Sequence, residues 1–291
     1  MTQNAWHAEI AVDGEVFSAI AEIAREEAGL HLEDSKRAMV SARLMRRVAR
    51  LGLTSLADYL PYISDPGAPE RRRMVSALTT NVSSFFREPH HFEALRREIL
   101  PPLIDAARRG GRVRLWSAGA AHGQEAYSIA LSVLDLEPSA PELDIRILGT
   151  DIDPSVIRFA QLAAYHRSMV GDVPERLRKS YFHFDASSET YLAKDPLQQL
   201  VIFRELNLHG PWPMPGRFDV IFCRNVVIYF GEDAQSALWP RFEAKLTDGG
   251  WLMVGHSERI PDGAAPNLQP REHTIYQRAR GTGPPSEELH P

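Results

Sequence analysis

The sequence predicts an α/β protein with a mostly parallel sheet, preceded by an all-α unit. From residue 112 onward, short β-rich runs alternate with helical stretches, which is typical of a parallel sheet covered on both faces. Before residue 80 the apolar residues follow helical spacing, and we find no strand pattern. With 291 residues, 44% of them hydrophobic, the chain can form one large or two modest domains, and a disulfide framework is excluded because Cys223 is the single cysteine.

The N-terminal unit, residues 1–80, contains four expected helices. Apolar residues in the first helix recur at 3.6-residue spacing, and Gly29 is suited to end it. Asp34 or Ser35 can cap the second. We expect the first helix at residues 15–28, the second from just after Asp34 or Ser35 to about residue 50, the third at 55–63 and the fourth at 70–79.

The second unit, residues 112–279, carries the expected sheet, and residues 81–111 form a linker that also contacts the ligand. Strands are expected at 113–116, 145–148, 200–203, 218–222 and 251–254, with helices at 125–136 and 154–165. The polar segment at about 168–199 is interpreted as a small inserted subdomain, and 280–291 as a disordered tail. A ligand is expected at the carboxyl ends of the strands.

A glycine-containing loop joins the first strand to its helix. Gly119 and Gly123 allow a sharp turn, but the loop has neither the G-x-G-x-x-G pattern nor the Lys-Ser/Thr of a triphosphate site. A tight turn without a ligand is an equal alternative. Glu125 in this loop suits a cationic ligand group better than a pyrophosphate.

An acidic pair follows the second strand. Asp151 is the better candidate for binding a ribose, and Asp153 the better helix cap, with Pro154 after it. Together with Glu125, these residues indicate an adenosine-like ligand with a positive group, which S-adenosylmethionine fits better than NAD or ATP.

Two further segments carry polar candidates. Arg87 follows two aromatic residues and offers the forked donors that bind carboxylates, unless it is a paired surface arginine. His90 and His91 are adjacent and have no cysteine or acidic cluster beside them, so we predict no metal site. Tyr229 follows the fourth strand; the alternative is that it belongs to the core.

The chain resembles the CheR family of chemotaxis receptor methyltransferases. Six blocks in the family's order, covering most of residues 15–277, carry the resemblance: TTNVSSFFREPHHF, LWSAGAAHGQEAYSIAL, ILGTDIDPSVIRFA, FRELNL, FDVIFCRNVVIYF and GGWLMVGHSE. The resemblance implies an N-terminal helical domain and a class I S-adenosylmethionine-dependent (Rossmann-like) methyltransferase domain with a small inserted β-subdomain. It also implies methylation of glutamates on the cytoplasmic helical bundles of chemoreceptors, which yields glutamyl methyl esters and S-adenosylhomocysteine for sensory adaptation.

The resemblance also implies site residues. The positions that match the family's cofactor contacts are Asn81, Ser83, Arg87, Glu125, Asp151, Asn207, Leu208, Arg224 and Asn225. Arg87 and Tyr229 match the pair placed closest to the transferred methyl group. The chain departs from the family pattern at Ser83, where Thr is common, and in the loop AAHGQEA, where a form like STGEEP is usual.

A basic helix is the candidate for substrate recognition. Between residues 36 and 50 there is no acid, and the arginines recur at spacings of three and four, so they share a side that can attract an acidic receptor helix. A solvated charged face is the alternative. The arginines are Arg43, Arg46, Arg47 and Arg50.

Several expectations concern partners and location. The net charge of −5 and the strand tip disfavour the nearest rival, a nucleic-acid methyltransferase, and the polar positions disfavour a signalling adaptor without turnover. The insertion lacks the Gly-rich loop of family members that dock on a receptor C-terminal peptide, so we expect no such tether. No apolar run approaches the roughly 20 residues of a membrane span. We expect a cytoplasmic monomer.

Overall fold

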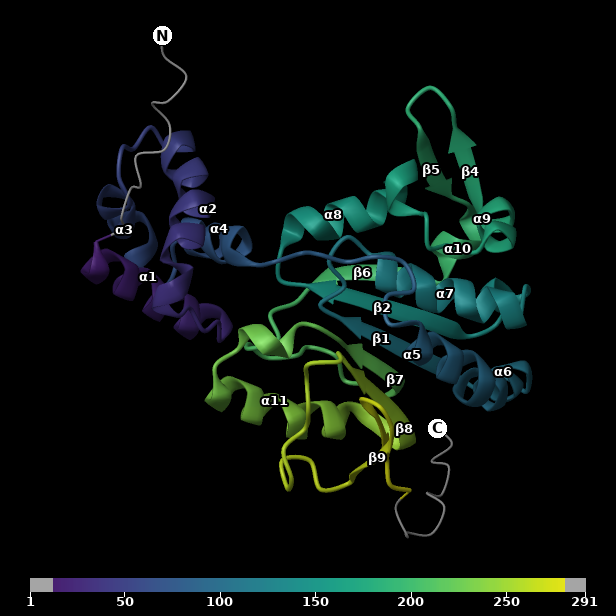
Figure 1. Cartoon of the computed structure of the whole chain (residues 1–291). Coiled ribbons are helices and arrows are strands. Elements are labelled where there is room, and N and C mark those ends of the chain that lie inside the picture. The colour runs from purple at the N-terminus through teal and green to yellow at the C-terminus, as the bar shows by residue number, and fades with distance from the viewer. Residues whose placement is uncertain (1–12, 281–291) are drawn as a thin grey trace.

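A computed structural model describes residues 13–280 of the chain, in which a group of N-terminal helices adjoins a seven-stranded sheet (Figure 1). Four α-helices form the N-terminal group, as predicted. Their apolar faces enclose a core of their own that includes Phe17, Ile20, Leu44, Tyr59 and Ile63. The helices are α1 (Gly14–Ala28), α2 (Arg37–Arg50), α3 (Leu56–Ser64) and α4 (Pro69–Leu78).

Capping residues explain where these helices start and end. Gly29 ends α1 in the left-handed conformation, as expected. Ser55 caps α3 and forms a capping box with Asp58. The predicted cap of α2 is wrong: a short 3₁₀ turn, η1 (Asp34–Lys36), precedes the helix, and the Asp34 carboxylate instead accepts from the guanidinium of Arg37 at 3.0 Å.

A buried ion pair holds α2 against α4. Arg47 on α2 donates two hydrogen bonds, of 2.8 and 2.7 Å, to the carboxylate of Glu70, which is 6% exposed. The hydroxyl of Tyr59 donates to the same carboxylate at 2.9 Å. Because removing one partner of a buried pair leaves the other charge uncompensated, this contact is a strong constraint on the packing of the helices.

The large sheet has the strand order β6-β2-β1-β7-β8-β10-β9. The first five strands in this order are parallel, as predicted, and β10 runs antiparallel to both its neighbours. The strands are β1 (Val113–Ala118), β2 (Ile145–Asp151), β6 (Val201–Glu205), β7 (Phe218–Cys223), β8 (Leu246–Val254), β9 (Leu268–Glu272) and β10 (Ile275–Arg278).

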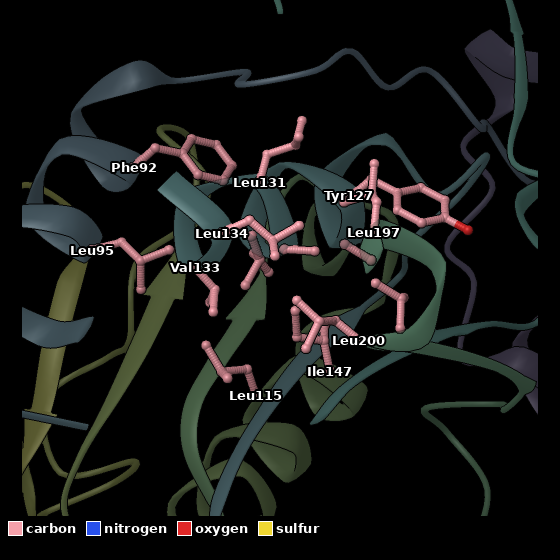
Figure 2. Packing of buried hydrophobic residues seen from close by; sticks show 14 of the residues in the cluster. Phe92, Leu95, Leu115, Tyr127, Leu131, Val133, Leu134, Ile147, Leu197 and Leu200 are labelled. Atoms are coloured by element: carbon pink, nitrogen blue, oxygen red, sulfur yellow. The ribbon is translucent and has the colours of Figure 1, made fainter. Parts of the chain in front are cut away.

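Helices cover both faces of the sheet (Figure 1). Two of them, α7 (Gln124–Leu136) and α8 (Pro154–Leu162), were expected from the sequence. Figure 2 shows how Val133 and Leu134 of α7 lie towards Leu115 of β1 and Ile147 of β2. These contacts place the two strands and their following loops in one rigid unit.

Several elements of this unit are not apparent in the sequence. The segment that we expected to be a linker contains α5 (Pro89–Ala94), a π-helical turn η2 (Leu95–Ile99) and α6 (Leu100–Arg108), which pack on the sheet core. On the opposite face lies α11 (Glu232–Lys245), whose pattern is interrupted by Pro240. In β9 only Leu268 is buried, so this strand lacks the alternation that would predict it.

The insertion is a small antiparallel sheet with the order β3-β5-β4. It begins at Ala164 rather than near residue 168 and packs on α7. Its elements are β3 (Ala164–His166), a 3₁₀ turn η4 (Arg167–Met169), α9 (Glu175–Tyr181), β4 (Phe182–Asp185), β5 (Thr190–Ala193) and α10 (Asp195–Gln199). Residues 281–291 of the predicted tail lie outside the described residues.

No helix within residues 13–280 has the combined length and apolarity that crossing a bilayer requires.

The ion pair between α2 and α4 makes Arg47 a structural residue. We expect Arg47→Ala to lower the free energy of unfolding by about 3 kcal/mol, because the buried Glu70 loses its two-hydrogen-bond partner and is left with the longer contact, 3.3 Å, with the exposed Arg73. Arg46→Ala, one position earlier on the exposed face, should change it by less than about 0.5 kcal/mol. Urea unfolding followed by circular dichroism measures both, and equal effects of the two variants would contradict the structural role.

Candidate active site

A cavity of about 410 Å³ lies at the carboxyl ends of the parallel strands, with residues of α1 and α2 on its far side. Its volume falls within the range of about 300 to 1,000 Å³ typical of small-molecule sites. The cavity brings together every position that the resemblance indicated for the cofactor and the methyl group: Asn81, Ser83, Arg87, Glu125, Asp151, Asn207, Leu208, Arg224, Asn225 and Tyr229.

The loop after β1 forms one wall of the cavity. Gly119 has a φ of +82°, and a Cβ atom there would lie 2.3 Å from Cγ2 of Val226 in the loop after β7. Only glycine allows this approach, so the two loops pack directly against each other. The helix α7 then begins at Gln124, which places Glu125 in its first turn at the base of the cavity.

Glu125 belongs to a buried ion network. Its carboxylate accepts from the Ser117 hydroxyl at 2.7 Å and from the guanidinium of Arg224 at 3.1 Å. Arg224, with a side chain only 1% exposed, also lies 3.3 Å from Oε2 of Glu88. Burial raises the pKa of Glu125, and the charge of Arg224 opposes this rise.

The charge balance of this network favours a cation. Two carboxylates, Glu88 and Glu125, share the single guanidinium of Arg224. Burial opposes ionisation of Glu88, but the positive charge of Arg224 and a hydrogen bond from His256 lower its pKa to about 2. When both carboxylates are ionised, the network carries one negative charge more than the guanidinium compensates, and a ligand with an ammonium or sulfonium group can neutralise it.

The two acids at the end of β2 have different surroundings, and the predicted cap role of Asp153 is confirmed. Asp153 caps α8, accepting from the backbone N–H of Ser155 at 2.8 Å. Asp151 lines the cavity and is 8% exposed; its two oxygens accept from the backbone N–H groups of Ala121 and Asp153 at 2.9 and 3.0 Å. Because each carboxylate oxygen has two lone pairs, Asp151 can still accept hydrogen bonds from a ligand.

The segment before the sheet is anchored by its aromatic residues. Phe85 is fully buried against Tyr165, and the backbone N–H of Phe86 donates to Ser128 Oγ at 2.9 Å. Phe86 and Glu88 both have positive φ values, of 52° and 57°. Backbone strain of this kind occurs mainly at functional sites, and here it directs the chain so that Arg87, between them, lines the cavity.

The departures from the family's loop sequence contact this same segment. Gln124 is buried and its Nε2 donates to the carbonyl of Ser83 at 3.2 Å. His122 Nδ1 lies 3.2 Å from the carbonyl oxygen of Asn81. Gln124 and His122 therefore hold the segment from 81 to 83 at the rim of the cavity.

The N-terminal helices contribute directly to the cavity. The side chain of Asn207 donates from Nδ2 to the carbonyl of Glu27 at the end of α1, at 2.6 Å. The backbone N–H of His31 donates to the carbonyl of Tyr229 at 2.9 Å, and that of Gly231 to the carbonyl of Gly29 at 3.0 Å. Tyr229 is half-buried and packs against the helical core, so its ring serves both that core and the cavity.

Two of the four arginines of the basic helix also form contacts within the protein. Arg43 donates to the carbonyls of Leu78 and Thr79, at 2.7 and 2.9 Å, at the end of α4, and Arg47 is paired with Glu70. Both guanidinium groups are thus engaged within the protein, but their side chains still line an open groove together with the exposed Arg46 and Arg50. Arg73 and Arg158 line the same groove. The assignment of the four arginines of α2 to substrate binding stays a prediction.

A cluster of possible metal donors lies behind Arg87. Within residues 13–280, ligand atoms of Glu88, His90 and His91 lie within 4.8 Å of one another. The guanidinium of Arg224, however, is 3.3 Å from the Glu88 carboxylate and opposes a cation there. The absence of a metal site stays a prediction.

Sequence reasoning missed residues on both sides of the cavity. His31, Ser35 and Lys36 line it from the N-terminal helices, although only the charge of Lys36 was apparent beforehand. Glu88 and Glu258 support the site from behind. Their roles depend on which backbone groups the fold brings to them, and a single sequence carries no signal for this.

Comparison with known proteins agrees with this geometry. Residues 81–276 match the family model described as the SAM binding domain of CheR methyltransferase, and residues 15–79 match the all-alpha domain of CheR methyltransferase. The chain is 46% identical over 237 residues to a probable chemotaxis protein methyltransferase of Rhizobium etli, covering 80% of this chain and 88% of that one.

Two further relatives are similar over comparable lengths. The chemotaxis protein methyltransferase of Escherichia coli is 37% identical over 249 residues, covering 84% of each chain. Chemotaxis protein methyltransferase 2 of Pseudomonas aeruginosa is 37% identical over 254 residues, covering 84% of this chain and 87% of that one.

The buried histidine behind the site predicts a pH-dependent stability. Burial, together with the charge of Arg224, lowers the pKa of His91 to about 3, so the folded protein keeps the ring neutral while the unfolded chain protonates it near pH 6.5. The stability that this provides is lost as the pH falls from about 6.5 towards 3. When the pH is lowered from 6.5 to 5, the free energy of unfolding of the wild-type protein should decrease by roughly 1.5 kcal/mol more than that of His91→Gln.

Urea unfolding at the two pH values measures this difference. His183→Gln, which alters an exposed ring on β4, is the matched control and should lose stability as the wild type does. If His91→Gln also loses as much as the wild type on acidification, the proposed titration of His91 is wrong.

Proposed function

The chain belongs to the CheR methyltransferase family, and we propose that it methylates glutamate side chains of chemoreceptors. It is an S-adenosylmethionine-dependent methyltransferase of chemotaxis, as the family and the relatives show. The observation that supports the proposal best is the single cavity in which Glu125, Asp151, Arg87 and Tyr229 meet.

The residues of the cavity fit the cofactor. The buried network around Glu125 carries excess negative charge and suits the ammonium group of the cofactor's methionine part. Asp151 would accept from the ribose hydroxyls, and Asn207 and Leu208 lie along the wall proposed for the adenine. When bound, S-adenosylmethionine supplies a methyl group on a sulfonium sulfur that leaves as a neutral thioether.

The reaction requires positioning more than proton transfer. A glutamate carboxylate has a pKa of about 4.3 and is already ionised at neutral pH, so no general base is needed. The chain must hold one carboxylate oxygen in line with the methyl group and exclude water, which can contribute about 7 to 11 kcal/mol. We assign to Arg87 and Tyr229 the role of holding the acceptor carboxylate or the methionine part of the cofactor.

The exposed arginines of α2 would guide the substrate. Arg46 and Arg50, with Arg73 and Arg158 of the adjoining groove, offer a positive surface near the cavity, and the methyl-accepting helices of receptors are rich in glutamate. Attraction of this kind acts mainly on the rate of encounter and is reduced by salt.

The proposal also covers the oligomeric state of the enzyme, its independence of a receptor tether and its location. The enzyme would act as a monomer. The connection between β4 and β5 is the short turn 186–189, without a Gly-rich loop, which supports recognition without a receptor C-terminal tether. The site of action would be the cytoplasm, where the receptor bundles lie.

A labelling experiment tests the activity. We expect incubation with tritiated S-adenosylmethionine and a receptor signalling fragment to give protein-bound label that mild base releases as methanol, as a glutamyl ester requires. Arg87→Ala should lower the rate about 100-fold through loss of alignment. Arg97→Ala, at an exposed position of η2, should match the wild type. Label that resists base, or normal turnover of Arg87→Ala, would contradict the reaction or the assignment respectively.

Charge reversal tests the basic surface. We expect the double variant Arg46→Glu/Arg50→Glu to raise the KM for the receptor fragment about tenfold, with the Kd for S-adenosylmethionine unchanged, because like charges would repel the acidic helix. The control Arg97→Glu/Arg217→Glu makes the same change in net charge at exposed positions outside the cavity and the groove. An equal KM for the two double variants would exclude a specific role of α2.

A further inference from the structure

A buried glutamate organises the loop that follows β7. Glu258 lies just after β8 and is 4% exposed. Its Oε1 accepts from the backbone N–H groups of Val226 and Val227 at 2.8 and 2.7 Å, and its Oε2 accepts from those of Asn225 and Gly255 at 2.9 and 2.6 Å. Oε1 also accepts a longer hydrogen bond, of 3.4 Å, from the N–H of Ile228, so one carboxylate satisfies five backbone donors, of which those of Val227 and Gly255 are buried.

The loop so held is the one that carries site residues. Arg224, Asn225 and Tyr229 all line the cavity, whereas Glu258 does not. Asn225 has a φ of +57°, a conformation that costs energy in a residue other than glycine and persists only where its surroundings enforce it. The Glu258 carboxylate provides that enforcement by accepting from the N–H of Asn225 itself.

The backbone packs closely around the carboxylate. A Cβ atom on Gly255 would lie 2.6 Å from Nδ2 of Asn225 and 2.9 Å from Oε2 of Glu258. On the other side, Gly119 allows Val226 to approach the loop after β1. The loop is therefore confined on two sides by backbone and fixed at its centre by a carboxylate.

We infer that Glu258 is a positioning residue for methyl transfer, which acts by holding residues 225–228 so that Arg224, Asn225 and Tyr229 face the cofactor and the acceptor. The inference rests on the proposed function of the cavity. It assigns to a residue outside the cavity an effect on cofactor binding and turnover, beyond any contribution to folding.

Replacement of one oxygen tests the inference. In Glu258→Gln the amide NH₂ cannot accept, so it opposes two backbone donors. We expect the Kd for S-adenosylmethionine, measured by calorimetry, to rise about ten- to a hundredfold, as loss of charge-assisted hydrogen bonds implies. Glu258→Asp keeps the carboxylate on a shorter side chain and should fall between Gln and the wild type in both cofactor affinity and kcat.

A matched variant separates positioning from stability. Asp219 is also a half-buried carboxylate that accepts a backbone N–H, from Arg114 at 2.8 Å, but it lies at the start of β7, at the other end of this strand. Asp219→Asn should lower the melting temperature while binding S-adenosylmethionine and turning over within about twofold of the wild type.

Each outcome then decides a different question. If the wild type does not bind S-adenosylmethionine, the proposed function itself fails. If the wild type binds and the folded Glu258 variants bind and turn over within about twofold of it, Glu258 contributes only to folding and the inference is overturned. If Glu258→Gln does not fold, Glu258→Asp decides: reduced affinity and kcat support the inference, and wild-type values overturn it.

Discussion

The cavity depends on one buried cation, the guanidinium of Arg224, and on the two carboxylates that share it. A guanidinium buried to this extent is stable only if anions and carbonyl groups surround it, and Arg224 finds them in Glu125, Glu88 and the carbonyl of Arg87. The same contacts join the loop after β7, the first turn of α7 and the strained segment around Arg87. Three pieces of chain that are distant in sequence thus form one polar floor, and the surplus of negative charge in that floor suits a cationic cofactor.

Several residues of the cavity also form hydrogen bonds within the protein. Asp151, Asn207 and Arg224 line the cavity, yet each also forms hydrogen bonds with the protein itself. Such contacts hold the side chains in place before a ligand arrives, which reduces the conformational entropy lost on binding. A site built in this way achieves alignment through a rigid framework, and alignment is what methyl transfer to an ionised carboxylate requires.

The parts of the fold that were predictable are those with a regular pattern. The four N-terminal helices, the five parallel strands and α7 and α8 all have apolar spacing that reads directly from the sequence, and the family blocks identified the residues of the cavity. Neither β9 nor α11 has such a pattern, because most side chains of β9 are exposed and α11 contains Pro240. The ion pair of Arg47 was not predictable for a related reason: charge and spacing are visible in a sequence, but the partner of Arg47, Glu70 on another helix, is set by packing.

The backbone pairing of residues 29–31 with 229–231 has a consequence for how receptor preference can be exchanged between homologues. The N-terminal helices carry the surface proposed for the substrate, but residues 29–31, which follow α1, form backbone hydrogen bonds with the loop that bears Tyr229. In a chimera that takes the helices from a relative, the relative's residues at 29–31 would have to pair with residues 229–231 of this chain. The helices should therefore be exchanged together with the loop that they pair with, because this backbone pairing limits where the chain can be recombined.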